Sequence, residues 1–392
     1  METSRLDWAF VRGLLPTGWR ELAVERGLVK PHPAHLHTKV TDIEQVLRPF
    51  LMRIGLDTSL RMATSTTASA RVARCDERGA EAADGAELVD LSAPALHHWE
   101  RKIGGYLAEL LARMLTSEEV LSPDRWAGYE VIAADGTSVS RPGATGTTAR
   151  VMYALRLSPP RVVGCHVLDE HSGESLRVFD VAPGQLWLAD RCYSNPYDIA
   201  WVVDHGADIV VRCQLHNLPL FDPEGQRIDV LRRLRPLKED WATAEWPVTL
   251  RPTDHAPIRG RVCAVRLPRE ATEKARARLR REGDDSARAL ETAQWIVVFT
   301  TTAADRVSTA QVLDVYRMRW QVELEIKRDK SLGGLDRLPN FRQDTIATWL
   351  FGKLLLQQIV HKAIASVAFP PGAAGTGSGS HGAGTGSHAT RG

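Results

Sequence analysis

Three isolated acidic residues stand where carboxylate chemistry could occur. Asp135 follows the apolar run "EVIAA" directly before a glycine, and Asp190 follows the similar run "QLWLA". Glu323 lies in "YRMRWQVELEIKRDK", residues 316–330, which contains neither proline nor glycine and is expected to be helical. A carboxylate at a strand end can simply form a turn or cap a helix, and Arg319 with Glu323 can simply be a helix ion pair. For each residue taken alone, these structural alternatives stay open.

The three acids together indicate a specific kind of chemistry. Carboxylates brought close to one another repel, and each raises the pKa of the others unless a cation neutralises them. Oxygen ligands without His or Cys in the same motifs suit Mg²⁺ or Mn²⁺ better than Zn²⁺. Two such ions, about 4 Å apart, form the arrangement used in phosphoryl transfer. We therefore expect two Mg²⁺ ions, replaceable by Mn²⁺, as cofactors at Asp135, Asp190 and Glu323.

A helix over 316–330 would collect its polar residues on one side. At 100° per residue, four of them share a narrow face: Tyr316, Arg319, Glu323 and Lys330. An apolar stripe lies next to that face and would fix the helix against a core: Val315, Met318, Val322 and Ile326. Glu325 falls near the opposite side, so we expect it to have no role in the chemistry.

The periodicity of the chain predicts the elements that position these residues. Residues 1–125 repeat apolar side chains at helical spacing, and Ser92 with Pro94 is typical of a helix start. From 129 onwards, short apolar runs separated by Gly, Pro and Ser clusters predict strands of one sheet. Residues 215–290 mix short strands with a basic segment, Arg269–Arg281, which is either a DNA-contacting or a solvated helix. An amphipathic helix is expected near 346–367.

Composition limits the class of protein. The 392 residues exceed what one core usually fills, and a net charge of +2 means that any attraction to nucleic acid must come from local basic faces. Five scattered cysteines argue against a zinc ribbon and a disulfide framework, which favours a reducing cytoplasm. The longest apolar stretch is interrupted by Lys and Gln, so no membrane span is expected. "PGATGT" lacks the Lys of a phosphate-binding loop, so no nucleotide cofactor is expected.

The three acidic motifs together resemble those of the insertion-sequence-4 group of DDE transposases. "ADGTSVSRPGATGT" is similar to the first-aspartate motif of that group and "LADRCYSNP" to the second. "VYRMRWQVELEIKRDKSLGGLDRLP" resembles the third, including its Tyr-Arg-Glu-Lys signature, and the likeness runs from about 40 to 362. The resemblance implies an α/β fold: a ribonuclease-H-like mixed sheet with flanking helices, a β-rich insertion before the glutamate helix, and a helical N-terminal region.

The resemblance also implies a domain organisation. A helical region that binds DNA ends would occupy 1–125, and the catalytic core would occupy 126–214 and 291–369. The insertion would occupy 215–290, because 133 residues separate Asp190 from Glu323 (323 − 190), whereas only 55 separate Asp135 from Asp190 (190 − 135). Residues 370–392, rich in Gly, Ser and Thr, would be disordered.

Roles of individual residues follow from the same resemblance. Asp135, Asp190 and Glu323 would hold the metal ions. Three residues of the glutamate helix would grip phosphates of the transposon end: Tyr316, Arg319 and Lys330. Trp295 would help to accommodate a base turned out of the stack, although a core aromatic is an equal alternative.

The implied reaction is hydrolysis at the element's end to free a 3′-hydroxyl, followed by attack of that hydroxyl on target DNA. Whether a DNA hairpin forms stays open. The partners would be double-stranded DNA, both element ends and target, and a second copy of the chain in a homodimer.

The sequence departs from the family pattern at two places, and two alternative functions therefore stay open. Cys192 stands where relatives usually have glycine, and the Gly-rich tail begins where many relatives continue with helices. A truncated copy could be a catalytically silent remnant that only binds DNA ends. A plain nuclease of the same fold is the other alternative.

Overall fold

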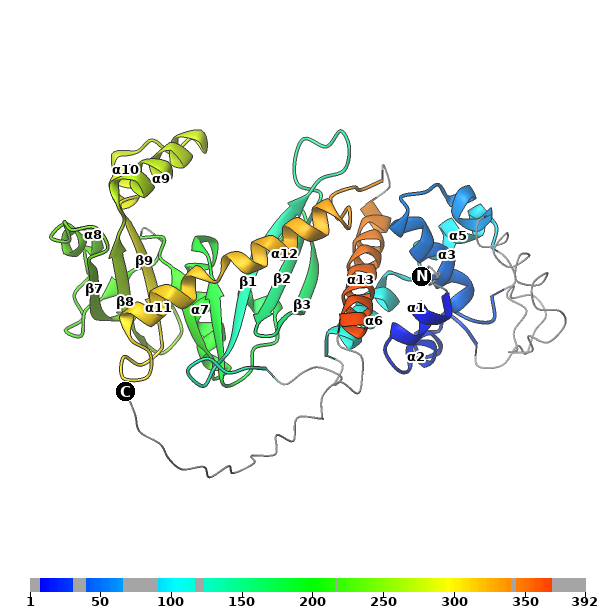
Figure 1. The fold of residues 1–392 in the computed structure, drawn as a ribbon, viewed down its shortest axis with the longest axis horizontal. Coiled ribbons are helices and arrows are strands. Elements are labelled where there is room, and N and C mark those ends of the chain that lie inside the picture. The colour runs from blue at the N-terminus through cyan, green and yellow to red at the C-terminus, as the bar shows by residue number, and fades with distance from the viewer. Residues whose placement is uncertain are drawn as a thin grey trace, which may run out of the picture.

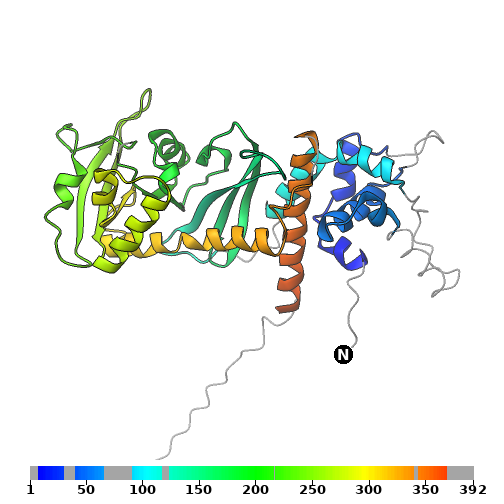
Figure 2. The same ribbon diagram turned by 90° about the horizontal axis from the view of Figure 1, so that it is seen from above.

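The protein is built around one sheet of nine strands with helices on both faces (Figures 1 and 2). The structure, a computed structural model, describes residues 8–30, 40–65, 91–116, 123–215, 217–339 and 343–368. The predicted tail, 370–392, lies outside the described residues. The strand order is β3-β2-β1-β4-β5-β9-β8-β7-β6. The expected mixed sheet of the ribonuclease-H-like fold is therefore confirmed.

The first five strands form the half of the sheet that carries the two aspartates. They are β1 (Glu130–Val139), β2 (Ala149–Leu157), β3 (Pro160–Asp169), β4 (Gln185–Ala189) and β5 (Asp208–Arg212). The first three pair antiparallel, whereas β1, β4 and β5 run parallel to one another. Because parallel strands point the same way, the carboxyl ends of β4 and β5 open towards the same edge, next to the second half of β1.

The other four strands continue the same sheet. They are β6 (Leu220–Phe221), β7 (Thr243–Leu250), β8 (Ile258–Arg266) and β9 (Trp295–Thr300). β9 pairs antiparallel with β5 on one side and with β8 on the other. The β-rich segment therefore extends the sheet of the first half instead of forming a separate one. It also contains three helices: α8 (Val230–Leu234), α9 (Arg269–Arg281) and α10 (Ala287–Thr292).

Helices cover the two faces of the sheet unequally. On one face, α11 (Thr309–Arg317) and α12 (Trp320–Ser331) run in succession across the strands, and on the other lies α7 (Pro196–Asp204) (Figure 2). β1 shows the alternation that this layering requires. Val131 and Ala133 belong to the core under α11 and α12, while Ile132 and Ala134 belong to the opposite core.

The helical N-terminal region packs against the C-terminal helix, α13 (Gln343–Ala368) (Figure 1). Its helices are α1 (Trp8–Leu14), α2 (Trp19–Glu25), α3 (Glu44–Gly55), α5 (Ala93–Glu100) and α6 (Gly104–Thr116). Ser92 caps α5 by accepting a hydrogen bond from the backbone N–H of Ala95, as the sequence predicted. Within the described ranges, no helix combines the length and the apolar character that a membrane span requires.

The predicted single helix over 316–330 is interrupted. α11 ends at Arg317 and α12 begins at Trp320, and the backbone N–H groups of Met318 and Arg319 donate to carbonyls three residues earlier. This tighter turn shifts the phase of the second helix, so the continuous wheel was wrong at the junction. Met318, predicted to belong to the apolar stripe, is 43% exposed, whereas Val322 is buried.

Candidate active site

The two aspartates meet at the point where the parallel strands stop pairing. In the register of β1 and β4, Ala133 lies opposite Leu188, so two residues further along Asp135 corresponds to Asp190. The sequence predicted both acids at strand ends. Asp190 does follow the last residue of β4, but Asp135 lies inside β1, where it still pairs with Tyr153 of β2. Asp135 is nevertheless open on its β4 side, because β4 has already ended.

Arg319 connects the acids of the sheet to the glutamate of α12. Its Nη2 lies 2.5 Å from Glu323 Oε1, and its Nη1 lies 3.6 Å from Asp135 Oδ2. The ion pair between Arg319 and Glu323, which the spacing suggested, is thus present, and the same guanidinium also reaches the sheet. The Arg319 side chain is only 12% exposed. The guanidinium therefore sits among the carboxylates and offsets their mutual repulsion.

The pKa values record how closely the three acids approach. The pKa of Asp135 is raised to about 6: burial is the largest cause, the charges of Glu323 and Asp190 act in the same direction, and the Gly136 N–H and Arg319 oppose them. Burial acts in the same direction on Asp190, but Arg319, the backbone N–H of Arg191 and the charge of Arg212 outweigh it, so that its pKa lies below the usual value. Two neighbouring aspartates thus have pKa values displaced in opposite directions.

This donor set fits a divalent cation. Three carboxylates converge, one of them with a raised pKa, and the positive charge that balances them comes from the Arg319 side chain. A cation bound between Asp135, Asp190 and Glu323 would remove the electrostatic penalty that raises the pKa of Asp135. Oxygen ligands of this kind are those that Mg²⁺ and Mn²⁺ accept.

The remaining residues of the signature border the acids at different distances. The Tyr316 hydroxyl lies 3.4 Å from Asp190 Oδ1, and burial together with the charge of Asp190 raises its pKa. Lys330 donates from Nζ to the carbonyl of Ser138 at 3.3 Å, near the end of β1. Seven residues separate Glu323 from Lys330, which corresponds to about 10 Å along the helix. Tyr316 therefore belongs to the acidic centre, whereas Lys330 lies beyond it.

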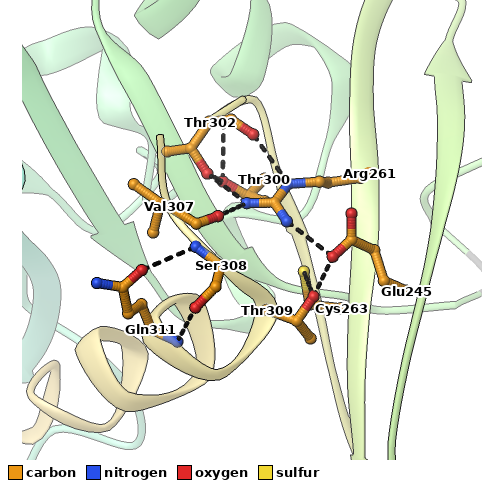
Figure 3. A network of polar contacts seen from close by, with 9 residues as sticks. All are labelled: Glu245, Arg261, Cys263, Thr300, Thr302, Val307, Ser308, Thr309 and Gln311. Carbon is orange, nitrogen blue, oxygen red and sulfur yellow. Dashed lines mark hydrogen bonds and ion pairs between the residues drawn. The ribbon is translucent and has the colours of Figure 1, made fainter. Parts of the chain in front are cut away.

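A buried polar network fixes the start of α11 (Figure 3). The guanidinium of Arg261, on β8, donates to the carbonyls of Thr302 and Val307 and pairs with Glu245 of β7, with Nη1 and Oε2 2.9 Å apart. Thr309 also donates to Glu245, and Ser308 forms a capping box with Gln311. The strands of the β-rich segment thereby hold the first turn of the helix that carries Tyr316.

A pocket of about 500 Å³ lies beside the acids, between α9, α10 and the sheet. Its lining includes six basic or aromatic side chains: Arg191, Arg212, Lys274, Arg278, Arg288 and Trp295. Trp295 is 4% exposed, packs in the core and has Arg266 over its ring at 4.8 Å. Trp295 is thus both a core aromatic and a wall of this pocket, so the two readings of the sequence are compatible.

Two more arginines lie near the acids: the sequence pattern did not point to Arg212, and it predicted Arg278 only as part of the basic segment Arg269–Arg281. Arg212 is the last residue of β5, and because Ala189 pairs with Val211 it corresponds to Asp190 on the neighbouring strand. The strand-end reasoning used for the aspartates could have found it. Arg278 of α9 is held by Glu282, and the charges of Asp190 and Glu323 raise its pKa further. The position of the β-rich segment in the fold shows that Arg278, among the basic residues of α9, is the one that the charges of these acids reach.

Comparison with known proteins agrees with this geometry. Residues 126–358 match the family described as Transposase DDE domain. The InsL protein of insertion sequence element IS186A of Escherichia coli strain K12 is 31% identical over 261 residues, which cover 64% of this chain and 70% of the relative. The transposase for insertion sequence element IS421 of Escherichia coli is similar to the same extent. The chain therefore belongs to the DDE transposases, a family of metal-dependent enzymes that cut DNA.

Proposed function

We propose that this transposase belongs to the insertion-sequence-4 group and that Asp135, Asp190 and Glu323 are its catalytic acids. The observation that carries this assignment is geometric: the strand register places Asp135 beside Asp190, and the Arg319 guanidinium contacts both Asp135 and Glu323. The charges of Asp190 and Glu323 also raise the pKa of Asp135, in support of this arrangement. Glu325, only two residues from Glu323, plays no part in that arrangement. The proposed cofactor is Mg²⁺, with Mn²⁺ as a substitute.

The divalent cations, when bound, would supply charge stabilisation for an attacking and a leaving oxygen at phosphorus. The chain's own contribution would be to bring the three carboxylates together in one place. Asp190 is suited to remain ionised, because Arg319 and Arg212 lower its pKa. Asp135 needs neutralisation to ionise fully at neutral pH, so cation binding and its deprotonation are coupled.

The signature residues would position the DNA backbone. The buried Nε and Nη1 atoms of Arg319 make no hydrogen bond of normal geometry, so the planar guanidinium retains donors for a phosphate. Tyr316 would donate to a phosphate next to the acids. Lys330, further along α12, would contact the backbone as a point charge. Trp295 and the neighbouring basic pocket would receive a nucleotide displaced from the duplex, with Arg278 contacting its phosphate.

The proposed reaction sequence is hydrolysis at the element's end followed by joining of the free 3′-hydroxyl to target DNA. In this assignment, residues 1–125 bind the element ends, α9 of the segment 215–290 contacts the DNA backbone, and two chains act together as a homodimer. The DNA on which it acts would be that of a bacterial nucleoid in the cytoplasm. The domain boundaries at 126–214 and 291–369 belong to the same proposal.

Cleavage of a labelled duplex that contains the element's end tests the assignment. With Mg²⁺, the wild-type chain should nick this duplex at the end and leave a duplex of unrelated sequence intact. Glu323→Gln should abolish nicking but retain binding, whereas Asp314→Asn, on the exposed side of α11, should behave like wild type. Binding without nicking by the wild-type chain would indicate a silent remnant, and equal cutting of both duplexes would indicate a plain nuclease.

A further inference from the structure

A second group of potential ligands lies on the other side of the catalytic helix. Glu325 and Asp329 of α12 and His361 of α13 each offer one ligand atom, and these atoms all lie within 4.8 Å of one another. Glu325 was expected to be an inert residue on the outer side of the helix. It is instead 5% exposed and points with Asp329 into the contact between α12 and α13.

Two carboxylate oxygens in this group are buried without a hydrogen-bond partner. They are Glu325 Oε1 and Asp329 Oδ1, and Asp329 is only 1% exposed. The other oxygens are satisfied: Arg328 Nη1 donates to Glu325 Oε2 at 3.2 Å, and the Tyr153 hydroxyl donates to Asp329 Oδ2 at 2.8 Å. Glu325 Oε1 lies 3.3 Å from His361 Nε2, and Asp329 Oδ1 has no such neighbour among the described residues. A buried carboxylate oxygen without a hydrogen bond is costly, so a positively charged ligand would stabilise both oxygens.

We propose that Glu325, Asp329 and His361 bind a divalent transition-metal ion of the Zn²⁺ or Mn²⁺ type. Two carboxylates and one imidazole form a mixed oxygen and nitrogen ligand set that such ions accept and that Mg²⁺ does not favour. His361 Nε2 lies 3.3 Å from Glu325 Oε1 and points at the two acids, so it is placed to act as a third ligand. Because the His361 side chain is 38% exposed, the ion can enter from solvent.

The electrostatics of the group agree with this site. The pKa of Asp329 is raised to about 7, mainly by burial and in addition by the charge of Glu325. Tyr153, on β2, opposes this rise through its hydrogen bond, and Arg328 opposes it through its charge. A bound cation would relieve the repulsion between the two acids, as in the catalytic group.

The site would have a structural consequence for catalysis. α12 carries Glu323 on one side and Glu325 with Asp329 on the other, while α13 packs against α6 and α3 of the N-terminal region. An ion shared by α12 and α13 would therefore couple the position of the catalytic helix to the helices proposed to bind DNA ends. This ion is distinct from those proposed at Asp135, Asp190 and Glu323.

Metal stoichiometry in a chain without catalytic ligands tests the site. The full-length Asp135→Asn, Glu323→Gln double variant, freed of metal and dialysed against Zn²⁺ or Mn²⁺, should bind one ion per chain at this group, as measured by elemental analysis. Adding His361→Ala should weaken binding by at least about 100-fold, since it removes a direct ligand. His255→Ala is the matched control, because His255 pairs with Asp204 at the surface and should leave binding unchanged.

Thermal unfolding provides a readout that does not depend on stoichiometry. The metal should raise the melting temperature of the double variant and of the His255→Ala control, but not of the His361→Ala or Glu325→Gln variants. Circular dichroism of the metal-free chains identifies any variant that fails to fold, and His361, being partly exposed, should tolerate replacement. Equal binding by the His361→Ala and His255→Ala chains, or no binding by any of them, would overturn the site in favour of a simple ion pair between His361 and Glu325.

Discussion

Asp135 and Asp190 occupy corresponding positions on two parallel strands, two residues beyond the pairing of Ala133 with Leu188. Their separation is thus set by backbone register and not by flexible side chains. Glu323, in contrast, is brought to them by a helix that follows a break in the chain. The sheet therefore sets the positions of the two aspartates, whereas the position of Glu323 depends on how α12 packs against the sheet.

Removing Arg319 should change the pH dependence of cleavage. Arg319 lowers the pKa of Asp190 against the effect of burial, so in Arg319→Ala this pKa should rise. Because the proposed mechanism requires ionised carboxylates, the acid limb of the pH–rate profile should move to higher pH. Cleavage rates measured between about pH 5 and 9 would show the shift.

Arg317→Ala is the control for this experiment, since Arg317 is exposed on the turn before the break. Its profile should coincide with that of wild type. A uniform loss of rate in Arg319→Ala, with no displacement of the acid limb, would show that Arg319 does not tune the acids.

Asp135→Asn should stabilise the metal-free protein at neutral pH. The folded-state pKa of Asp135 is raised from 3.8 to about 6, so its ionisation opposes folding. The protonated form favours the fold fully below about pH 4, and this contribution is lost as the pH rises through about 6. At pH 8 the penalty amounts to about 3 kcal/mol at most.

Denaturant unfolding in the presence of a chelator measures this effect. Asparagine keeps the oxygen that accepts the Gly136 N–H, so the comparison isolates the charge. The gain in unfolding free energy should be largest at pH 8 and should shrink towards pH 4.5. A variant that is less stable than wild type at both pH values would contradict the burial of a strained carboxylate.

Gly136→Ala should disturb the strand beside Asp135. A methyl group there would lie 2.9 Å from both Glu174 Cδ and Met152 Sδ, and Met152 is fully buried. Overpacking of this kind costs about 1–3 kcal/mol, so the melting temperature should fall. Gly146→Ala, where nothing lies within 4 Å, should have little effect. If both alanine variants have the melting temperature of wild type, β1 accommodates the methyl group at position 136 and the close contact does not affect stability.

Arg261→Ala should destabilise the junction between the β-rich segment and α11. Arg261 is 5% exposed, and its loss leaves the Thr302 and Val307 carbonyls without their donor and Glu245 without its ion-pair partner. Breaking such a buried network costs about 3 kcal/mol or more. Urea unfolding should show this loss, whereas Arg259→Ala, exposed on the same strand, should not. Equal midpoints for the two variants would mean that the network does not hold α11.

The sequence predicted the strands and helices that carry the site residues more accurately than it predicted where those elements end. Asp190 could be placed because it directly follows an apolar run that stops where β4 stops. The position of Asp135 was harder to predict. β1 continues past this residue in its pairing with β2, and only the pairing with β4 has ended. No Pro or Gly lies near the helix break at Met318, so the local sequence does not indicate that the helix is interrupted there. The break arises where α11 and α12 pack on different parts of one sheet.

Long-range features left no trace in the sequence pattern. The extension of the sheet through β9 depends on pairing between segments far apart in the chain. The burial of Glu325 and Asp329 was not predicted, because charged residues on a helix normally face solvent and their neighbour His361 lies on another helix. The basic pocket beside Asp190 likewise requires α9 to fold back towards the catalytic half.

The position of Mn²⁺ in crystals tests the central claim most directly, because anomalous scattering identifies the ion and its ligands independently of activity. We expect Mn²⁺ in contact with carboxylate oxygens of Asp135 and Asp190, with Glu323 as the third ligand in place of its ion pair with Arg319. Glu323→Gln should reduce that signal, and Asp314→Asn should not. Mn²⁺ bound elsewhere in the chain, with none between Asp135 and Asp190 at saturating concentration, would contradict the account.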